Sequence, residues 1–164
     1  MGLAGTCLAP ASVLAAPAAR QLSFVHTHTG EALTLTYAEL GGYIASALQR
    51  VNLLLRDFRT EEIHPIDPAL LDLLYAVATS TATNEPFHVI SGYRSPRTNA
   101  LLRMRSEGVA RASLHMQGRA IDIRLPDVPL RTLREAAIDL RLGGVGYYRR
   151  SDFVHVDTGR VRIW

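Results

Sequence analysis

The sequence predicts an α+β domain, in which helices pack on a small and largely antiparallel sheet. Three observations lead to this class. Short segments of alternating apolar and polar residues predict strands, and segments with apolar residues three and four positions apart predict helices. The length of 164 residues fits a single domain. The composition, with 48% hydrophobic and 20% charged residues, is typical of a folded chain and excludes wholesale disorder.

The first 19 residues differ from the rest because they contain no charged side chain and are mostly small or apolar. The segment is short and rich in Ala and Pro for a membrane-spanning helix, but Ala16-Pro17-Ala18 has the A-x-A pattern of a signal-peptide cleavage site. We therefore expect residues 1–19 to be an export signal and residues 20–164 to be the folded domain. The basic residues that usually open such a signal are missing, which indicates a start upstream of Met1. A disordered tail is the alternative.

The first part of the folded domain begins with two alternating segments, residues 22–26 and 32–36, around Thr29-Gly30-Glu31. This pattern predicts a β-hairpin. An amphipathic helix is then predicted over residues 37–59 by apolar residues at helical spacing. These residues are Leu40, Ile44, Leu48, Val51, Leu55 and Phe58.

The middle of the chain predicts two more helices and a strand between them. Asp67 followed by Pro68 is a typical helix start, with a capping side chain and then a proline in the first turn. Residues 87–90 predict a short strand. Ser95 and Pro96 repeat the start signal, and that helix is expected to end near Arg105.

In the last third, residues 120–125 alternate so that Ile121 and Ile123 face one side of a strand and Asp122 the other. Residues 130–140 return to helical spacing, with Gly143-Gly144 as the expected stop. Residues 145–148 and 153–157 then predict two paired strands that are joined through residues 149–151.

Candidate metal ligands lie on these last strands. Alternation places His155 and Asp157 on one face, and His115 precedes Asp122 by seven residues. Two imidazoles and one carboxylate can give Zn²⁺ three protein ligands and leave a fourth position open for catalysis. From spacing alone, a solvated His115 and a hydrogen-bonded core His155 remain the simpler interpretation.

Charge and cysteine content narrow the classes of function. The formal net charge of +3 and the pI of about 9.4 are too modest to indicate a nucleic-acid partner, but they suit a mildly anionic polymer. The single cysteine, Cys7, excludes an intrachain disulfide and a Cys-rich metal site. Cleavage of the expected signal would leave no cysteine, which is compatible with an oxidising envelope compartment.

Several blocks of the chain, from about residue 20 to the C-terminus, resemble M15-like periplasmic murein endopeptidases. These blocks are HTHTGE (26–31), LRD (55–57), SGYRS (91–95), GVA (108–110), S-x-H-x-x-G-x-A-x-D (113–122), GGVGYY (143–148) and S-x-FVHVDTG (151–159). The block at 113–122 is shared with D-alanyl-D-alanine peptidases and, more loosely, with the zinc fold of hedgehog domains. The resemblance implies a zinc peptidase fold of that kind, with His115, Asp122 and His155 as the zinc ligands.

The resemblance also implies roles for other side chains. Arg94 matches an active-site arginine that contacts the substrate or the developing oxyanion, a task that suits a planar guanidinium. Ser113 matches a position that contacts the substrate backbone. An ordinary surface arginine and a turn serine are the respective alternatives.

The general base is expected to be one of two aspartates. D-alanyl-D-alanine peptidases of this group have a Glu three residues before the last ligand, and Asp152 has that spacing here with a side chain one methylene shorter. Asp157 is the rival, although it can instead orient a ligand imidazole. We expect Asp152 to be the base and Asp157 to be structural.

The function that follows is a zinc-dependent peptidoglycan hydrolase, which cleaves murein cross-links or stem peptides with a zinc-activated water. Family resemblance points to bonds made by meso-diaminopimelate. A D-alanyl-D-alanine carboxypeptidase and a zinc-stabilised module that binds murein without cutting it are the alternatives. We expect a periplasmic monomer with peptidoglycan as its partner and with neither nucleic-acid binding nor stable membrane insertion.

Other polar and aromatic residues are expected to be structural. His26 and His28 share a face of the hairpin and are expected to belong to its scaffold, with metal binding as the alternative. Tyr147, Tyr148 and Trp164 are expected to pack in the core or at its rim.

Overall fold

The computed structural model describes residues 19–105 and 109–164. The strands are β1 (Arg20–His26), β2 (Ala32–Glu39), β3 (Gly42–Tyr43), β4 (Phe87–Ser91), β5 (Ala120–Arg124), β6 (Gly144–Tyr148), β7 (Phe153–Asp157) and β8 (Arg162–Ile163). The helices are α1 (Ala45–Leu54), α2 (Pro68–Thr81), α3 (Pro96–Arg105) and α4 (Leu130–Leu140), with 3₁₀ turns at Leu114–Gln117 and Arg149–Ser151.

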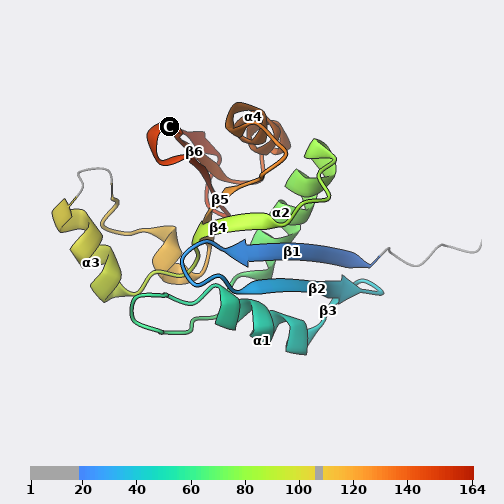
Figure 1. Cartoon of the computed structure of the whole chain (residues 1–164), viewed down its shortest axis with the longest axis horizontal. Helices are drawn as coiled ribbons and strands as arrows, with labels where there is room; N and C mark the ends of the chain where they lie inside the picture. The colour runs from blue at the N-terminus through green and yellow to red at the C-terminus, as the bar shows by residue number, and fades with distance from the viewer. Residues whose placement is uncertain (1–18, 106–108) are drawn as a thin grey trace, which may run out of the picture.

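The strands form one sheet in the order β3-β2-β1-β4-β5-β7-β6-β8. The β1–β4 and β6–β8 pairs are parallel, and the other five pairs are antiparallel. In Figure 1, α1 lies beside β2, α2 packs against α4, and α3 projects at the left of the view. The α+β class and the largely antiparallel sheet are therefore confirmed.

The hydrophobic core lies between the sheet and the helices α1, α2 and α4. On β5, Ile121 and Ile123 are fully buried in this core, whereas Asp122 is buried on the opposite face of the same strand. A central strand covered on both sides has few conformational alternatives, because each residue is fixed by its neighbours. β5 thus gives Asp122 a rigid support.

The helix expected over residues 37–59 is shorter and begins later. β2 continues through Tyr37, which is fully buried, and α1 runs only from Ala45 to Leu54. Leu40 has a φ of 49° and is 77% exposed in a turn with Gly41. The apolar spacing was misleading because Tyr37 fits the alternation of β2, and the glycine pair at 41–42 disfavours a helix.

The other expected elements are confirmed, with one change of detail. The Asp67 side chain accepts a hydrogen bond from the Ala69 amide at the start of α2. α4 ends on Arg141, whose φ is 54°, and not on a glycine. Gly143 is required for a different reason, because a Cβ at this position would lie 1.7 Å from the Asp157 carbonyl oxygen. This glycine allows the chain to pass close to the end of β7.

The expected export signal at residues 1–19 lies outside the described residues, apart from Ala19. Within residues 19–105 and 109–164, the structure contains no helix with the length and apolar character that a bilayer crossing requires.

Candidate metal centre and active site

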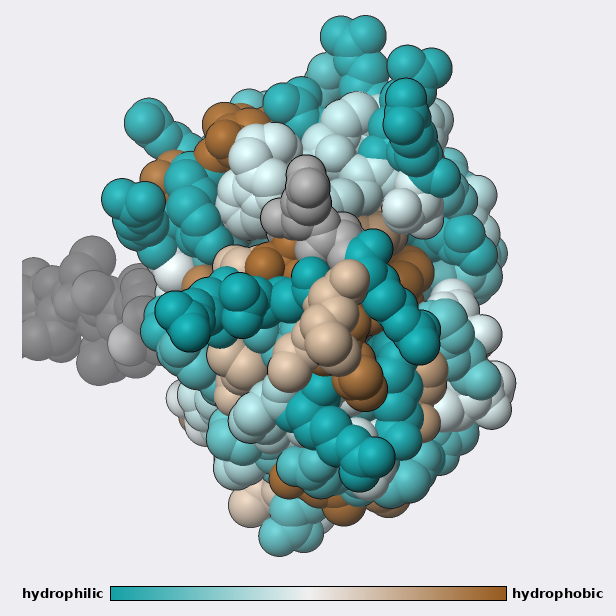
Figure 2. Space-filling model, turned by 90° about the vertical axis from the view of Figure 1, so that its left-hand side faces the viewer, coloured by the Kyte–Doolittle hydropathy of each residue, from teal (hydrophilic) through white to brown (hydrophobic). Residues whose placement is uncertain are grey.

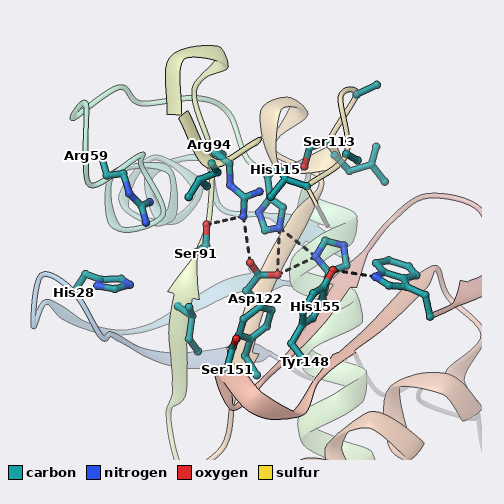
Figure 3. Close-up of a pocket in the computed structure, with 18 of the residues that line it drawn as sticks. His28, Arg59, Ser91, Arg94, Ser113, His115, Asp122, Tyr148, Ser151 and His155 are labelled. Atoms are coloured by element: carbon teal, nitrogen blue, oxygen red, sulfur yellow. Dashed lines mark hydrogen bonds and ion pairs between the residues drawn. The ribbon is translucent and has the colours of Figure 1, made fainter. Parts of the chain in front are cut away.

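A cavity of about 520 Å³ lies over the polar face of β5 and β7. Its walls come from the β4–α3 connection, the turn at residues 114–117 and the β6–β7 hairpin, and Figure 3 shows these side chains. Figure 2 looks onto the side where α3 lies, on which hydrophobic groups are exposed among strongly hydrophilic ones. On α3, Leu101 and Met104 contribute to this exposed apolar surface.

Three buried side chains converge in the cavity. His115 Nε2 lies 3.1 Å from His155 Nδ1 and 3.2 Å from Asp122 Oδ1, and His155 Nδ1 lies 2.9 Å from the same oxygen. The edges of a tetrahedron with zinc–ligand bonds near 2.05 Å are about 3.3 Å long. The three atoms therefore form a triangle with nearly the dimensions of one face of a zinc coordination tetrahedron. The three side chains could together hold a metal ion.

The fold explains why residues so far apart in sequence meet here. Asp122 and His155 are direct partners in the antiparallel register of β5 and β7. His115 is held on the 3₁₀ turn, which ends at Gly118 with a φ of 66°. A Cβ on Gly118 would lie 2.1 Å from the Pro65 carbonyl oxygen, so this tight turn requires glycine.

In each imidazole, the nitrogen that points away from the three-residue group donates a hydrogen bond. His115 Nδ1–H donates to the Gly92 carbonyl at 2.8 Å, and His155 Nε2–H donates to Asp157 Oδ2 at 3.0 Å. These bonds fix the tautomers, so the free lone pairs of His115 and His155 point toward each other and toward Asp122. Lone pairs that converge on a carboxylate need a cation between them, which makes this donor set fit a metal ion.

The protonation preferences follow from burial and from the neighbouring charges. Burial lowers the pKa of His115, which favours the neutral ligand form. Burial alone would raise the pKa of Asp122, but His115 and His155 hold it well below its usual range. For His155, burial is outweighed by the carboxylates of Asp122 and Asp157, which stabilise the protonated imidazole and so raise its pKa. Protons and metal therefore compete for this nitrogen.

Arg94 and Ser113 both line the cavity. An Arg94 terminal nitrogen lies 3.3 Å from Asp122 Oδ2 and 3.4 Å from Ser91 Oγ. Its buried Nε has no hydrogen-bond partner among the described residues. The Ser113 hydroxyl accepts from the His115 amide and so caps the turn. The structure thus brings Arg94 next to the three-residue group, while Ser113 supports the turn that carries His115.

The two aspartates that were candidates for the base lie in very different places. The Asp152 side chain is 62% exposed, forms an ion pair with Arg124 and borders a different surface hollow. Asp157 is fully buried, and its oxygens accept hydrogen bonds from His155, Arg162 and the Gly144 and Gly159 amides. The structure does not bring Asp152 to the three-residue group, and it places Asp157 behind His155.

Sequence reasoning missed several residues of the cavity wall. Tyr148, Trp164 and His28, which were expected to be structural, line it together with Arg59. The pairing of β6 with β7 contained a usable signal for Tyr148. Gly146 pairs with His155 and Tyr148 with Phe153, so strand alternation puts Tyr148 on the same face as His155.

Two imidazoles and a carboxylate lie at the floor of an open cavity on the sheet of an α+β domain. This arrangement is typical of the metal centre of a metallopeptidase. The sequence model of the family Peptidase_M15_2, described as "Peptidoglycan L,D-endopeptidase MepK", matches residues 14–164. The chain therefore belongs to this peptidase family, and the resemblance found in its motifs is confirmed.

Curated relatives agree with this family over most of their length. The chain is 44% identical over 153 residues to "Peptidoglycan L,D-endopeptidase MepK" of Escherichia coli strain K12, covering 93% of this chain and 84% of the relative. It is 43% identical over 164 residues to "Probable peptidoglycan L,D-endopeptidase MepK" of Haemophilus influenzae, covering 98% and 88% respectively.

Proposed function

We propose that this chain is a zinc-dependent peptidoglycan hydrolase that cuts peptide cross-links of murein at bonds made by meso-diaminopimelate. The observation that carries the proposal is the convergence of His115, Asp122 and His155 on one point in an open cavity. The names of the relatives support an L,D-endopeptidase activity in particular.

The proposed metal ligands are His115 Nε2, Asp122 Oδ1 and His155 Nδ1. Two nitrogens and one oxygen in a near-tetrahedral triangle suit zinc, and an open fourth position is typical of catalytic zinc sites. Zinc bound there supplies a Lewis acid that polarises a carbonyl and lowers the pKa of a water molecule to about 7. Asp157 positions the His155 ring for this task, and its contacts favour that role over the role of base.

The charges around the cavity support an anionic peptide as the substrate. Arg59 and Arg94 both line the wall, and in the described part of the chain no carboxylate forms an ion pair with Arg59. Arg94 also lies beside the proposed metal ligands, so it can contact a substrate carbonyl or carboxylate. Murein stem peptides carry such carboxylates.

Murein lies outside the cytoplasmic membrane, so this function requires export. We propose a periplasmic monomer in which residues 20–164 act as the catalytic domain and residues 1–19 belong to the export signal. Fractionation of cells that express the gene from its natural start, with a C-terminal tag, will show whether the processed domain is in the periplasm.

Digestion of three purified muropeptides tests the activity. These are an L,D-cross-linked dimer, a D,D-cross-linked dimer and a monomer with a terminal D-Ala-D-Ala. We expect the zinc-loaded enzyme to convert the L,D-cross-linked dimer into monomers, and we expect His115→Ala and chelator-treated protein to be inactive. Loss of terminal D-Ala alone would identify a carboxypeptidase. Retention of all three substrates by a zinc-containing protein that binds sacculi would identify a binding module.

A further inference from the structure

Tyr148 lies at the end of β6, on the face of the sheet that carries the proposed metal ligands. It lines the cavity together with His155, and Figure 3 shows its ring beside the three-residue group. In that view, Arg94 lies on the other side of Asp122. Tyr147, the preceding residue, faces the opposite side of the sheet, where it packs on the core and lies under Arg134.

The Tyr148 hydroxyl is the acceptor in its hydrogen bond with Trp164. Trp164 Nε1 lies 3.0 Å from the Tyr148 oxygen, and an indole N–H can only donate. The phenolic oxygen is therefore the acceptor in this bond, and its own proton is left for a different partner. Among the described residues, the structure gives this hydroxyl no second hydrogen bond.

Aromatic neighbours hold the phenol in place. The Tyr148 ring stacks on Phe153, its partner across the hairpin, with centroids 4.6 Å apart and an interplanar angle of 20°. Trp164 is anchored by backbone hydrogen bonds to Val145 and Tyr147. Gly146 leaves room for the indole, since a Cβ there would lie 2.7 Å from the Trp164 ring. The hydroxyl is thus fixed before a substrate arrives, which is the condition for effective electrostatic stabilisation.

We propose that Tyr148 is a catalytic residue, whose hydroxyl donates a hydrogen bond to the carbonyl oxygen of the scissile peptide as that oxygen becomes negative. When the water oxygen bonds to the carbonyl carbon, the π electrons of the C=O bond move to the carbonyl oxygen. As these electrons re-form the C=O bond, the C–N bond breaks and the leaving amine takes up the proton that the water has lost. Tyr148 keeps its own proton throughout. This inference rests on the proposed function. Tyr148 then supplies a hydrogen-bond donor on the side of the cavity opposite Arg94. Asp152 is exposed and paired with Arg124, so it does not contact this part of the cavity.

Tyr148→Phe tests the role because it removes the hydroxyl and retains the ring that stacks on Phe153. We expect kcat on the L,D-cross-linked dimer to fall about 100-fold, as for other oxyanion donors, with little change in KM. Bound zinc should stay at the wild-type level. Tyr147→Phe is the matched control, because it removes a hydroxyl from the other face of the same strand, and it should keep the wild-type kcat.

A binding measurement gives a readout that is independent of turnover. A phosphinate analogue of the cross-link carries a tetrahedral anion, so its affinity should fall at least about tenfold in Tyr148→Phe. The affinity of a non-cleavable peptide with a planar amide should not change. A wild-type kcat in Tyr148→Phe, or loss of zinc from it, would overturn the inference. If the wild-type enzyme itself leaves the dimer uncut, the proposed function fails instead.

Discussion

Asp157 contacts His155, a proposed metal ligand, and is not among the residues that line the cavity. Its carboxylate accepts the Nε2–H of His155, and its other contacts, to Arg162 and two amides, keep it fully buried. Such a partner orients a ligand imidazole and makes it more basic.

We therefore expect Asp157→Asn to weaken zinc binding by about 10- to 100-fold, because the neutral amide no longer supports the electron density on His155. Competition with a chromophoric chelator measures this change. Asp152→Asn is the control, since Asp152 is exposed and, within the described parts of the chain, is paired only with Arg124. Equal zinc affinities in the two variants would contradict the positioning role.

Arg59 offers a second test at this scale. Its guanidinium lies 4.1 Å from the centroid of the Phe58 ring, which in turn stacks on His28, so the cation is held at one end of the cavity. We expect Arg59→Gln to raise KM for the cross-linked dimer about tenfold, because a charged hydrogen bond to a substrate carboxylate is lost. Steady-state kinetics measure this effect.

Two controls make the Arg59 experiment specific. A dimer whose diaminopimelate carboxylates are amidated should show the same KM with wild-type and variant enzyme. Arg97→Gln removes an exposed arginine that does not line the cavity and should leave KM unchanged. A KM increase in Arg59→Gln that persists with the amidated dimer would argue against recognition of a carboxylate.

At the scale of elements, Asp57 ties the segment after α1 to the start of α3. It is 1% exposed, and it accepts hydrogen bonds from the Ser95 amide at 2.8 Å and the Arg59 amide at 3.0 Å. Burial by itself raises the pKa of Asp57, but the hydroxyls of Thr98 and Ser95 and the amides of Ser95 and Arg59 outweigh burial and leave the pKa below its usual value.

This depressed pKa predicts the direction of a pH effect on stability. The contribution of Asp57 is complete above the unfolded-state pKa near 4 and is lost as the pH falls through the lower folded-state pKa. We expect Asp57→Asn to lose about 1–3 kcal/mol at pH 7 and to lose less further stability on acidification than the wild type. Urea unfolding at pH 3 to 7 measures both curves, and parallel curves would exclude this linkage.

Most of the correct structural predictions came from the alternation of apolar and polar residues in the strands. It placed Asp122 and His155 on polar faces, and the structure pairs them across β5 and β7. Spacing did not predict where the Asp152 side chain lies, because a distance along the chain does not specify direction at a turn. Asp152 has a φ of 54°, directly after the 3₁₀ turn at Arg149–Ser151, and its side chain lies beside Arg124. The predicted pairing of residues 145–148 with 153–157 contains the information that Tyr148 and His155 share a face, but the cavity on that face is a tertiary feature.

For the whole molecule, the three proposed metal ligands come from parts of the chain that folding brings together, namely the turn at Leu114–Gln117 and the paired strands β5 and β7. His115 and His155 are 40 residues apart, and Asp122 belongs to a central strand. We therefore expect metal binding to be linked to folding, because the unfolded chain has no preformed site. Motif order along the sequence was sufficient to predict the family, whereas the cavity wall depends on long-range packing of Arg59, Tyr148 and Trp164.

We expect removal of zinc with a chelator to lower the thermal midpoint by about 5–15 °C, since a ligand at 1,000 times its Kd stabilises by about 4 kcal/mol. Differential scanning calorimetry measures the shift, and added zinc should reverse it. His115→Ala should melt at the same temperature with and without chelator. An unchanged midpoint for the chelated wild type would show that no metal stabilises the fold.

Trp164 is the single tryptophan of this sequence, and it lies in the cavity wall. The centroids of its ring and of the His155 ring are 5.2 Å apart. Its intrinsic fluorescence therefore comes from one known position, with no background from other indoles. We expect metal loading, occupancy of the cavity and protonation of the neighbouring imidazole each to alter the surroundings of this fluorophore. The protein thus carries its own optical probe, and binding can be followed by emission without attaching a label.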